Sequence, residues 1–122
     1  EDMQIVHLRL AQVYGEGMRQ DRIIPVMKKE LERENIITVY GNGKRESNFI
    51  EVSKLVKYIE YFFHHDISGI YNLGDQNLSY YELAKLLIGQ YGNEGSTIVK
   101  IQKGSKEKFN LDSSKIQDLV IY

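Results

Sequence analysis

The sequence contains no cysteine, which excludes disulfide bonds, thiolate metal sites and a cysteine nucleophile. It has no run approaching the ~20 apolar residues of a membrane helix, and no signal peptide opens it. Neither sign of charge dominates, because 16 Lys and Arg face 17 Asp and Glu. This balance argues against nucleic acid or an anionic membrane as the main partner. We therefore expect a cytoplasmic protein without a membrane partner.

The residues that are present describe an ordinary globular chain. A length of 122 residues with 42% hydrophobic and 27% charged residues predicts one domain with a modest core. Helical and strand patterns alternate without an internal repeat, so we expect a small α/β or α+β layer. The sequence starts directly in a predicted strand and stops abruptly, which suggests a fragment of a longer protein.

Periodicity and turn residues predict the elements. We expect strands at residues 4–11, 36–40, 48–52, 70–73 and 97–101, and helices at 23–33, 53–65 and 79–91. Asp112 can cap a short last helix, and Ser79 with Glu82 forms a capping box. The buried stripes are expected to hold Leu55, Val56, Ile59, Phe62 and Phe63 on the second helix, and Leu83, Leu86, Leu87 and Tyr91 on the third.

The most informative stretch is residues 38–52 (TVYGNGKRESNFIEV). Two β-prone runs flank Gly41-Asn42-Gly43, and Asn-Gly tolerates the positive φ angles of a tight hairpin turn. Lys44 and Arg45 follow at once, and cations beside flexible backbone suit the binding of a phosphate. A plain surface hairpin with solvated charges is the other interpretation. Other cations and tyrosines that suit a phosphate, a base or a sugar are Arg19, Arg22, Lys103, Lys106, Tyr14, Tyr40 and Tyr71.

Three other patterns are weaker. Tyr81 and Lys85 have the Tyr-x-x-x-Lys spacing of a proton-shuttling pair, but no dinucleotide fingerprint precedes them, and we interpret Tyr81 as a helix-surface aromatic. His64 and His65 are adjacent on a helix and point in different directions, so they do not chelate a metal together. No Gly-x-Gly-x-x-Gly follows a strand, so this chain alone cannot hold a dinucleotide in the usual way.

Several segments, taken in order, carry a family resemblance. Residues 8–17 read LRLAQVYGEG, and further segments are 23–25 (IIP), 37–45 (ITVYGNGKR), 48–52 (NFIEV), 69–74 (GIYNLG), 79–84 (SYYELA) and 112–116 (DSSKI). They resemble the Leu-Arg-x-x-Asn-Val-Tyr-Gly-Pro-Gly, Ile-Pro, Ile-Tyr-Gly-Asp-Gly, Asp-Phe-Ile-Tyr-Val, Tyr-Asn-Ile-Gly, Ser-x-x-Glu-Leu and Asp-x-Ser-Lys runs of NAD-dependent sugar-nucleotide epimerases and dehydratases. These enzymes are extended short-chain dehydrogenase/reductases.

The resemblance implies both a fold and a function. The fold is α/β: residues 1–17 are the end of a Rossmann-like sheet with its connecting loop, and residues 18–122 are a small mixed α/β substrate-binding subdomain. The implied activity is hydride removal from a sugar carbon by NAD or NADP, followed by epimerisation, dehydration or reduction, as an isomerase or lyase. The cofactor glycines and the catalytic Tyr-x-x-x-Lys would lie in an upstream Rossmann domain of the same chain. A homodimer is also allowed.

The resemblance also suggests binding residues. Arg45 would pair with a phosphate of a nucleoside-diphosphate sugar, Tyr40 would lie beside the base, Gln12 would bond the sugar or phosphate, and Tyr14 and Lys103 complete the set. Ser47, Lys54 and Gln102 depart from the pattern, because the family carries arginine near the first and last and aspartate at the second. A non-catalytic nucleotide-sugar-binding or protein-interaction module on the same fold is therefore the alternative.

Overall fold

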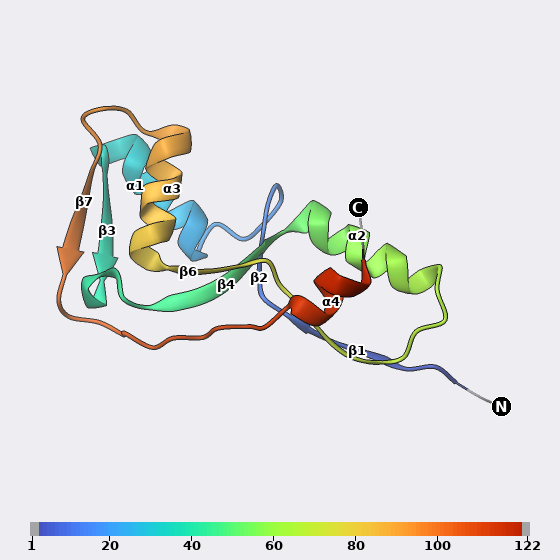
Figure 1. Cartoon of the computed structure of the whole chain (residues 1–122). Coiled ribbons are helices and arrows are strands. Elements are labelled where there is room, and N and C mark those ends of the chain that lie inside the picture. The colour runs from blue at the N-terminus through green and yellow to red at the C-terminus, as the bar shows by residue number, and fades with distance from the viewer. Residues whose placement is uncertain (1–2, 121–122) are drawn as a thin grey trace. The chain divides into compact units, whose positions relative to one another are not determined.

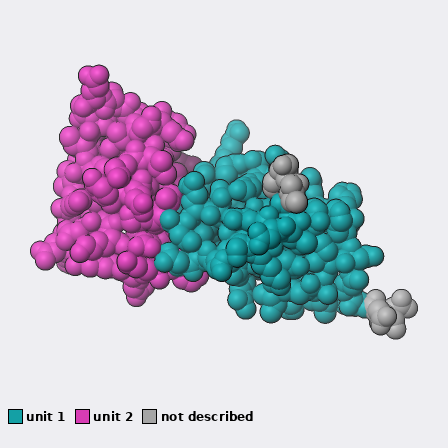
Figure 2. Space-filling view, viewed as in Figure 1, with its two compact units in different colours: residues 1–16, 48–77, 110–122 teal, residues 17–47, 78–109 magenta. Residues whose placement is uncertain are grey.

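The computed structural model describes residues 3–120 and groups them into two compact units. Unit 1 holds residues 3–16, 48–77 and 110–120, and unit 2 holds residues 17–47 and 78–109 (Figure 2). The chain thus passes from one unit to the other four times. Residues 3–16 form a unit with later segments, so the two units differ from a simple division at residue 17. The functional meaning of that division stays a prediction.

Unit 1 is built around a pair of parallel strands. β1 (Val6–Leu10) lies parallel to β5 (Gly69–Leu73), with Leu10 opposite Leu73. β2 (Gln12–Tyr14) runs parallel to β4 (Glu46–Glu51) in a sheet of order β2-β4-β6, where β6 is Gln76–Ser79. The helices are α2 (Val52–Phe63) and α4 (Ser114–Leu119). The core of the unit consists of Ile50, Leu55, Tyr58, Tyr71, Leu73, Ile116 and Val120.

Unit 2 packs two helices on a second pair of parallel strands. β3 (Ile36–Tyr40) lies parallel to β7 (Thr97–Ile101) (Figure 1). α1 (Ile23–Glu34) and α3 (Tyr80–Tyr91) contact each other and β3. Pro25 lies in the first turn of α1, as expected from its missing N–H. The buried apolar residues of the unit are Ile24, Met27, Leu31, Ile37, Val39, Tyr80, Leu83, Ala84 and Leu87.

The predicted hairpin is wrong. Gly41–Gly43 forms a short 3₁₀ turn, and the two strands beside it do not pair with each other. β3 takes β7 as its parallel partner, and β4 takes β2. The positive φ was correctly predicted, since φ is 58° at Gly41, 56° at Asn42 and 72° at Gly43. Local turn chemistry was read correctly, but the partner of each strand is decided by segments far away in sequence.

The buried helix faces are also only partly as predicted. α2 buries Leu55 and Tyr58, whereas Val56 and Phe63 are 45% and 81% exposed. On α3, Leu83 and Leu87 are buried, but Leu86 and Tyr91 are 49% and 56% exposed. On α2 and on α3, the apolar stripe predicted from the sequence is wider than the helix face that is buried within its unit. Tyr58 was not among the residues expected in the buried stripe, but its ring packs in the core of unit 1.

The start of α3 agrees with the sequence and gives a pH prediction. Ser79 N–H donates to Glu82 (2.9 Å) and Glu82 N–H donates to Ser79 Oγ (3.1 Å), which completes the capping box. The hydrogen bond from the Ser79 backbone, assisted by the Ser79 hydroxyl and the charge of Lys85, lowers the pKa of Glu82. A carboxyl with a lowered pKa adds stability above its unfolded pKa and loses it as the pH falls through the folded value.

We expect Glu82→Gln to flatten this dependence, because glutamine keeps the capping box but does not titrate. At pH 7 the variant should be less stable by about 0.5 kcal/mol, as is usual for an exposed carboxylate in a first helical turn. The difference should shrink as the pH falls below about 4.3. Urea unfolding at pH 7, 5 and 3.5 measures it, and a difference that grows towards acid would contradict the expectation.

Candidate functional site

The Gly41–Gly43 turn lies close to other backbone, which its glycines permit. Gly41 N–H donates to Lys103 O (2.9 Å), and Lys44 N–H donates to Gly41 O (3.1 Å). A Cβ at Gly41 would lie 2.2 Å from Ser105 O, and one at Gly43 would lie 2.8 Å from Tyr81 Cβ. The N–H groups of Gly41 and Lys44 therefore already have hydrogen-bond partners within the chain. The role of the turn is to place the residues on either side of it.

Arg45 is exposed and lies at the start of α3. Its carbonyl accepts the Tyr80 N–H at 2.8 Å, and its guanidinium carbon lies 5.3 Å from the centre of the Tyr80 ring. A guanidinium over an aromatic face is held by the ring quadrupole and keeps its N–H groups for an oxyanion. Arg45 is thus oriented within unit 2 and remains accessible.

Tyr40 and Lys103 meet at the end of the β3–β7 pair. Tyr40 is 59% exposed and stands opposite Ile101 in the register. A Cβ at Gly104 would lie 2.8 Å from Tyr40 Cβ, so the segment after β7 runs directly along Tyr40. The structure therefore brings Tyr40 and Lys103 together, with the main chain of Lys103 fixed by Gly41.

Gln12 and Tyr14 both lie on β2 of unit 1. Their partners on β4 are Phe49 and Glu51. Gln12 is exposed and Tyr14 is half-buried, and residues two apart on a strand point to the same side. The hydroxyl and N–H of Ser53 bond the Glu51 carboxylate and lower its pKa, so the partner of Tyr14 in the register is an anion.

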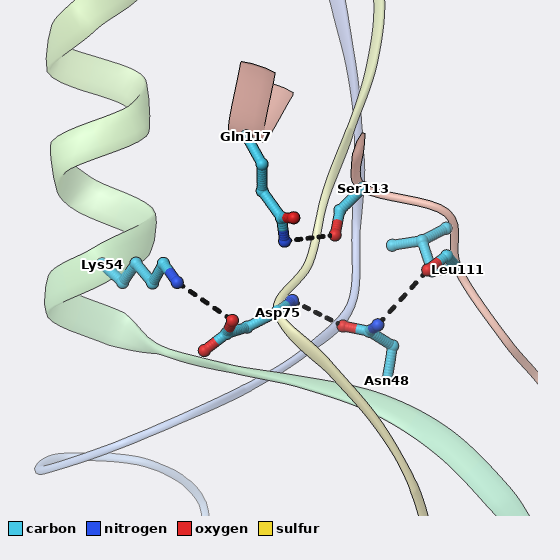
Figure 3. A network of polar contacts seen from close by, with 6 residues as sticks. All are labelled: Asn48, Lys54, Asp75, Leu111, Ser113 and Gln117. Carbon is cyan, nitrogen blue, oxygen red and sulfur yellow. Dashed lines mark hydrogen bonds and ion pairs between the residues drawn. The ribbon is translucent and has the colours of Figure 1, made fainter. Parts of the chain in front are cut away.

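A polar network that the sequence did not reveal holds unit 1 together (Figure 3). Asn48, only 1% exposed, accepts the Asp75 N–H (2.9 Å) and donates to Asn77 Oδ1 (2.9 Å) and Leu111 O (3.4 Å). Lys54 pairs with Asp75 at 2.9 Å. The only signal in the sequence was a polar residue before the buried pair Phe49-Ile50. Lys54 stands where the family pattern has aspartate, and in this structure the carboxylate of Asp75 is its ion-pair partner.

The two other residues that depart from the family pattern, Ser47 and Gln102, differ in burial. Ser47 is 4% exposed, and Gln102 is exposed. Of the remaining candidate cations, Arg19 pairs with Asp21 at 2.7 Å and is less available to a ligand. The structure thus groups the predicted residues as Gln12 with Tyr14 in unit 1, and Tyr40 with Lys103 and the α3-bound Arg45 in unit 2.

The rejected patterns keep structural roles. His65 stacks on Tyr61 with ring centres 3.9 Å apart, and its Nδ1 lies 2.8 Å from Tyr61 O. Within residues 3–120 no group of three or more metal-ligating side chains is close enough to hold an ion. In the same range no helix has the length and hydropathy to cross a membrane.

The glycines of this chain do not fit a dinucleotide. A pyrophosphate cradle needs a glycine-rich turn that leads from a strand directly into a helix. Gly15 and Gly17 lie well before α1, which begins at Ile23, and Gly41–Gly43 is followed by β4 rather than a helix. No chemical step of NAD is therefore assigned to residues of this chain.

A protein-family comparison places the chain in a class. Residues 1–74 match the model of the NAD dependent epimerase/dehydratase family. The chain belongs to this family, as its motifs indicated. No curated protein matches it.

Several solved structures share the Rossmann-like epimerase/dehydratase fold with this chain. UDP-N-acetylglucosamine 4-epimerase from Methanobrevibacter ruminantium M1, in complex with UDP-N-acetylmuramic acid, has a TM-score of 0.80 at 17% identity over 98% of this chain and 41% of its own. UDP-N-acetylglucosamine 4-epimerase from Bacillus cereus has a TM-score of 0.76 at 24% identity, over 96% of this chain and 39% of its own. UDP-glucuronic acid 4-epimerase from Bacillus cereus, in complex with UDP-glucuronic acid and NAD, has a TM-score of 0.71 at 23% identity, over 96% of this chain and 39% of its own. The chain thus spans about two fifths of the length of these enzymes.

Proposed function

We propose that this chain is the substrate-binding portion of an NAD(P)-dependent sugar-nucleotide epimerase or dehydratase. The observation that carries the proposal is its membership of that family through residues 1–74. The similar structures support it, because two of them hold a UDP-sugar and one of those also holds NAD. In this proposal the cofactor and the catalytic Tyr-x-x-x-Lys belong to an upstream Rossmann domain. A cytoplasmic location and a homodimer complete the proposal.

The residues of this chain bind and orient the substrate. Arg45, held over Tyr80, takes an oxygen of the diphosphate, and Lys103 is a second cation. Tyr40 offers an exposed ring face to the base, and Gln12 an amide to the sugar or phosphate. Tyr14 lies beside Gln12 on β2. Holding the donor sugar in one orientation is what a hydride transfer requires from this part of an enzyme.

Arg45→Ala tests the proposal. We expect UDP-N-acetylglucosamine, or the best ligand in a panel of uridine, guanosine and thymidine diphosphate sugars, to bind about 10-fold more weakly, because a charge-assisted hydrogen bond is worth about 1.4 kcal/mol. Isothermal titration calorimetry measures the affinity. The control is Arg33→Ala, since Arg33 is an exposed arginine in the last turn of α1.

The same titration weighs the alternative, a non-catalytic module. The observation that favours that alternative is Ser47, a buried serine at the position where the family pattern described in the sequence analysis has arginine. If no sugar nucleotide binds and Arg45→Ala behaves like the unmodified chain, the alternative is supported. Reading the gene sequence upstream of residue 1 further separates the proposed enzyme from the non-catalytic module, because the enzyme needs a glycine-rich strand-to-helix turn there.

A further inference from the structure

The first two residues of α3 gather cations from three segments of unit 2. The Arg45 guanidinium lies over Tyr80, with 5.3 Å between its central carbon and the ring centre. Lys100 Nζ on β7 lies 4.2 Å from the centre of the Tyr81 ring, and Lys85 Nζ lies 4.9 Å from it. The sequence analysis singled out Arg45 and the spacing of Tyr81 and Lys85, but not Lys100. Lys100 joins it because its strand is the parallel partner of β3.

These cations are exposed and have no direct carboxylate partner among residues 3–120. Arg45, Lys85 and Lys100 are all exposed. The ion pairs of the described chain involve Arg19, Lys54 and Lys108, and none includes these three. The charges of Glu82 and Lys85 attract each other without forming a direct ion pair, whereas no ion pair in the described chain includes Arg45 or Lys100. The three cations together therefore carry more positive charge than the neighbouring Glu82 offsets.

The tyrosine rings make the cations suitable for a ligand. A ring holds an ammonium group in place without neutralising it, which lowers the entropy cost of ordering a long lysine when an anion binds. The ammonium groups of Lys85 and Lys100 lie no farther apart than the sum of their distances to the Tyr81 ring. One diphosphate, with hydrogen bonds of about 2.8 Å at each end, can span that separation.

We propose that Lys85 and Lys100, held by Tyr81, form a second cationic contact for the diphosphate of the sugar nucleotide, in addition to the contact proposed for Arg45. This inference rests on the proposed function and changes one of its residues. Lys103 was the expected second cation, but the contact the structure gives it is made by its main-chain carbonyl. Lys100 is the lysine whose ammonium group is oriented beside α3.

Lys100→Ala tests the inference in the 122-residue chain. We expect about 10-fold weaker binding of both UDP-N-acetylglucosamine and inorganic pyrophosphate, and no change for uridine, which has no phosphate. Lys28→Ala is the matched control, because Lys28 Nζ lies 4.3 Å from the Tyr91 ring centre at the opposite end of α3. It should bind all three probes like the unmodified chain. Circular dichroism verifies that each variant is folded.

Further variants separate charge from packing. Lys100→Gln keeps the length of the chain and should lose affinity like the alanine variant. Tyr81→Phe keeps the ring and should bind normally, whereas Tyr81→Leu should bind several-fold more weakly. Nucleotide-sugar binding that needs Arg45 but not Lys85 or Lys100 would overturn the inference and leave the proposed function standing. Lys100-dependent pyrophosphate binding without any nucleotide-sugar binding would support the cluster and reject the proposed function.

Discussion

Gly41→Ala is expected to destabilise the protein by about 4 kcal/mol. About 1 kcal/mol comes from a side chain at φ 58°, in the left-handed region that favours glycine. About 3 kcal/mol comes from overlap, because the new Cβ would lie 2.2 Å from Ser105 O and backbone must move to relieve it. The chain has no tryptophan, so circular dichroism during urea unfolding is a suitable measurement.

Gly17→Ala separates the two causes. Gly17 has φ 87°, but nothing lies within 4 Å of the position its Cβ would take. It should therefore cost only the conformational part, about 1 kcal/mol. If the two variants lost equal stability, the close approach of the Gly41 turn to the segment after β7 would be refuted.

Asn48→Ala is expected to cost about 3 kcal/mol. The side chain is 1% exposed, and its removal leaves the Asp75 N–H, Asn77 Oδ1 and Leu111 O without this partner inside unit 1. Each buried polar group left without a partner costs about 1–3 kcal/mol, and part of this is recovered when Asn77 and water rearrange. Urea unfolding measures the loss.

Asn110→Ala is the control for that experiment. Asn110 is an exposed asparagine next to Leu111, so its removal should change stability by less than about 0.5 kcal/mol. A similarly small effect for Asn48→Ala would show that the polar network does not hold β4, β6 and the 110–113 segment together. A large effect would identify Asn48 as the residue that joins these three segments.

The local features of the fold were predictable because short-range chemistry determines them. Ser79 and Glu82 predicted the start of α3, and the Asn42-Gly43 pair predicted positive φ, since both depend on neighbours a few residues away. Family membership was likewise predictable from ordered motifs. The short strands β2 and β6 were missed, because three or four residues carry too little periodicity to register.

The candidate site was predicted less completely. Arg45 was chosen for its neighbours in the sequence, and the structure adds Tyr80 as the ring that holds it. Lys100 was missed because it lies 15 residues from Lys85 and in another element. Asn48 was missed because a polar residue in a strand is usually on the surface. In each case the decisive neighbour is distant along the chain.

The sequence by itself determined the class of the chain, most of its helices and strands, and the positive φ angles of its tight turn. Only the tertiary structure decided that β3 pairs with β7 rather than with β4, which side chains each helix buries, and which cations meet at α3. The physical reason is that parallel strands need long connections, so their pairing depends on the packing of the whole unit and not on the turn between neighbours.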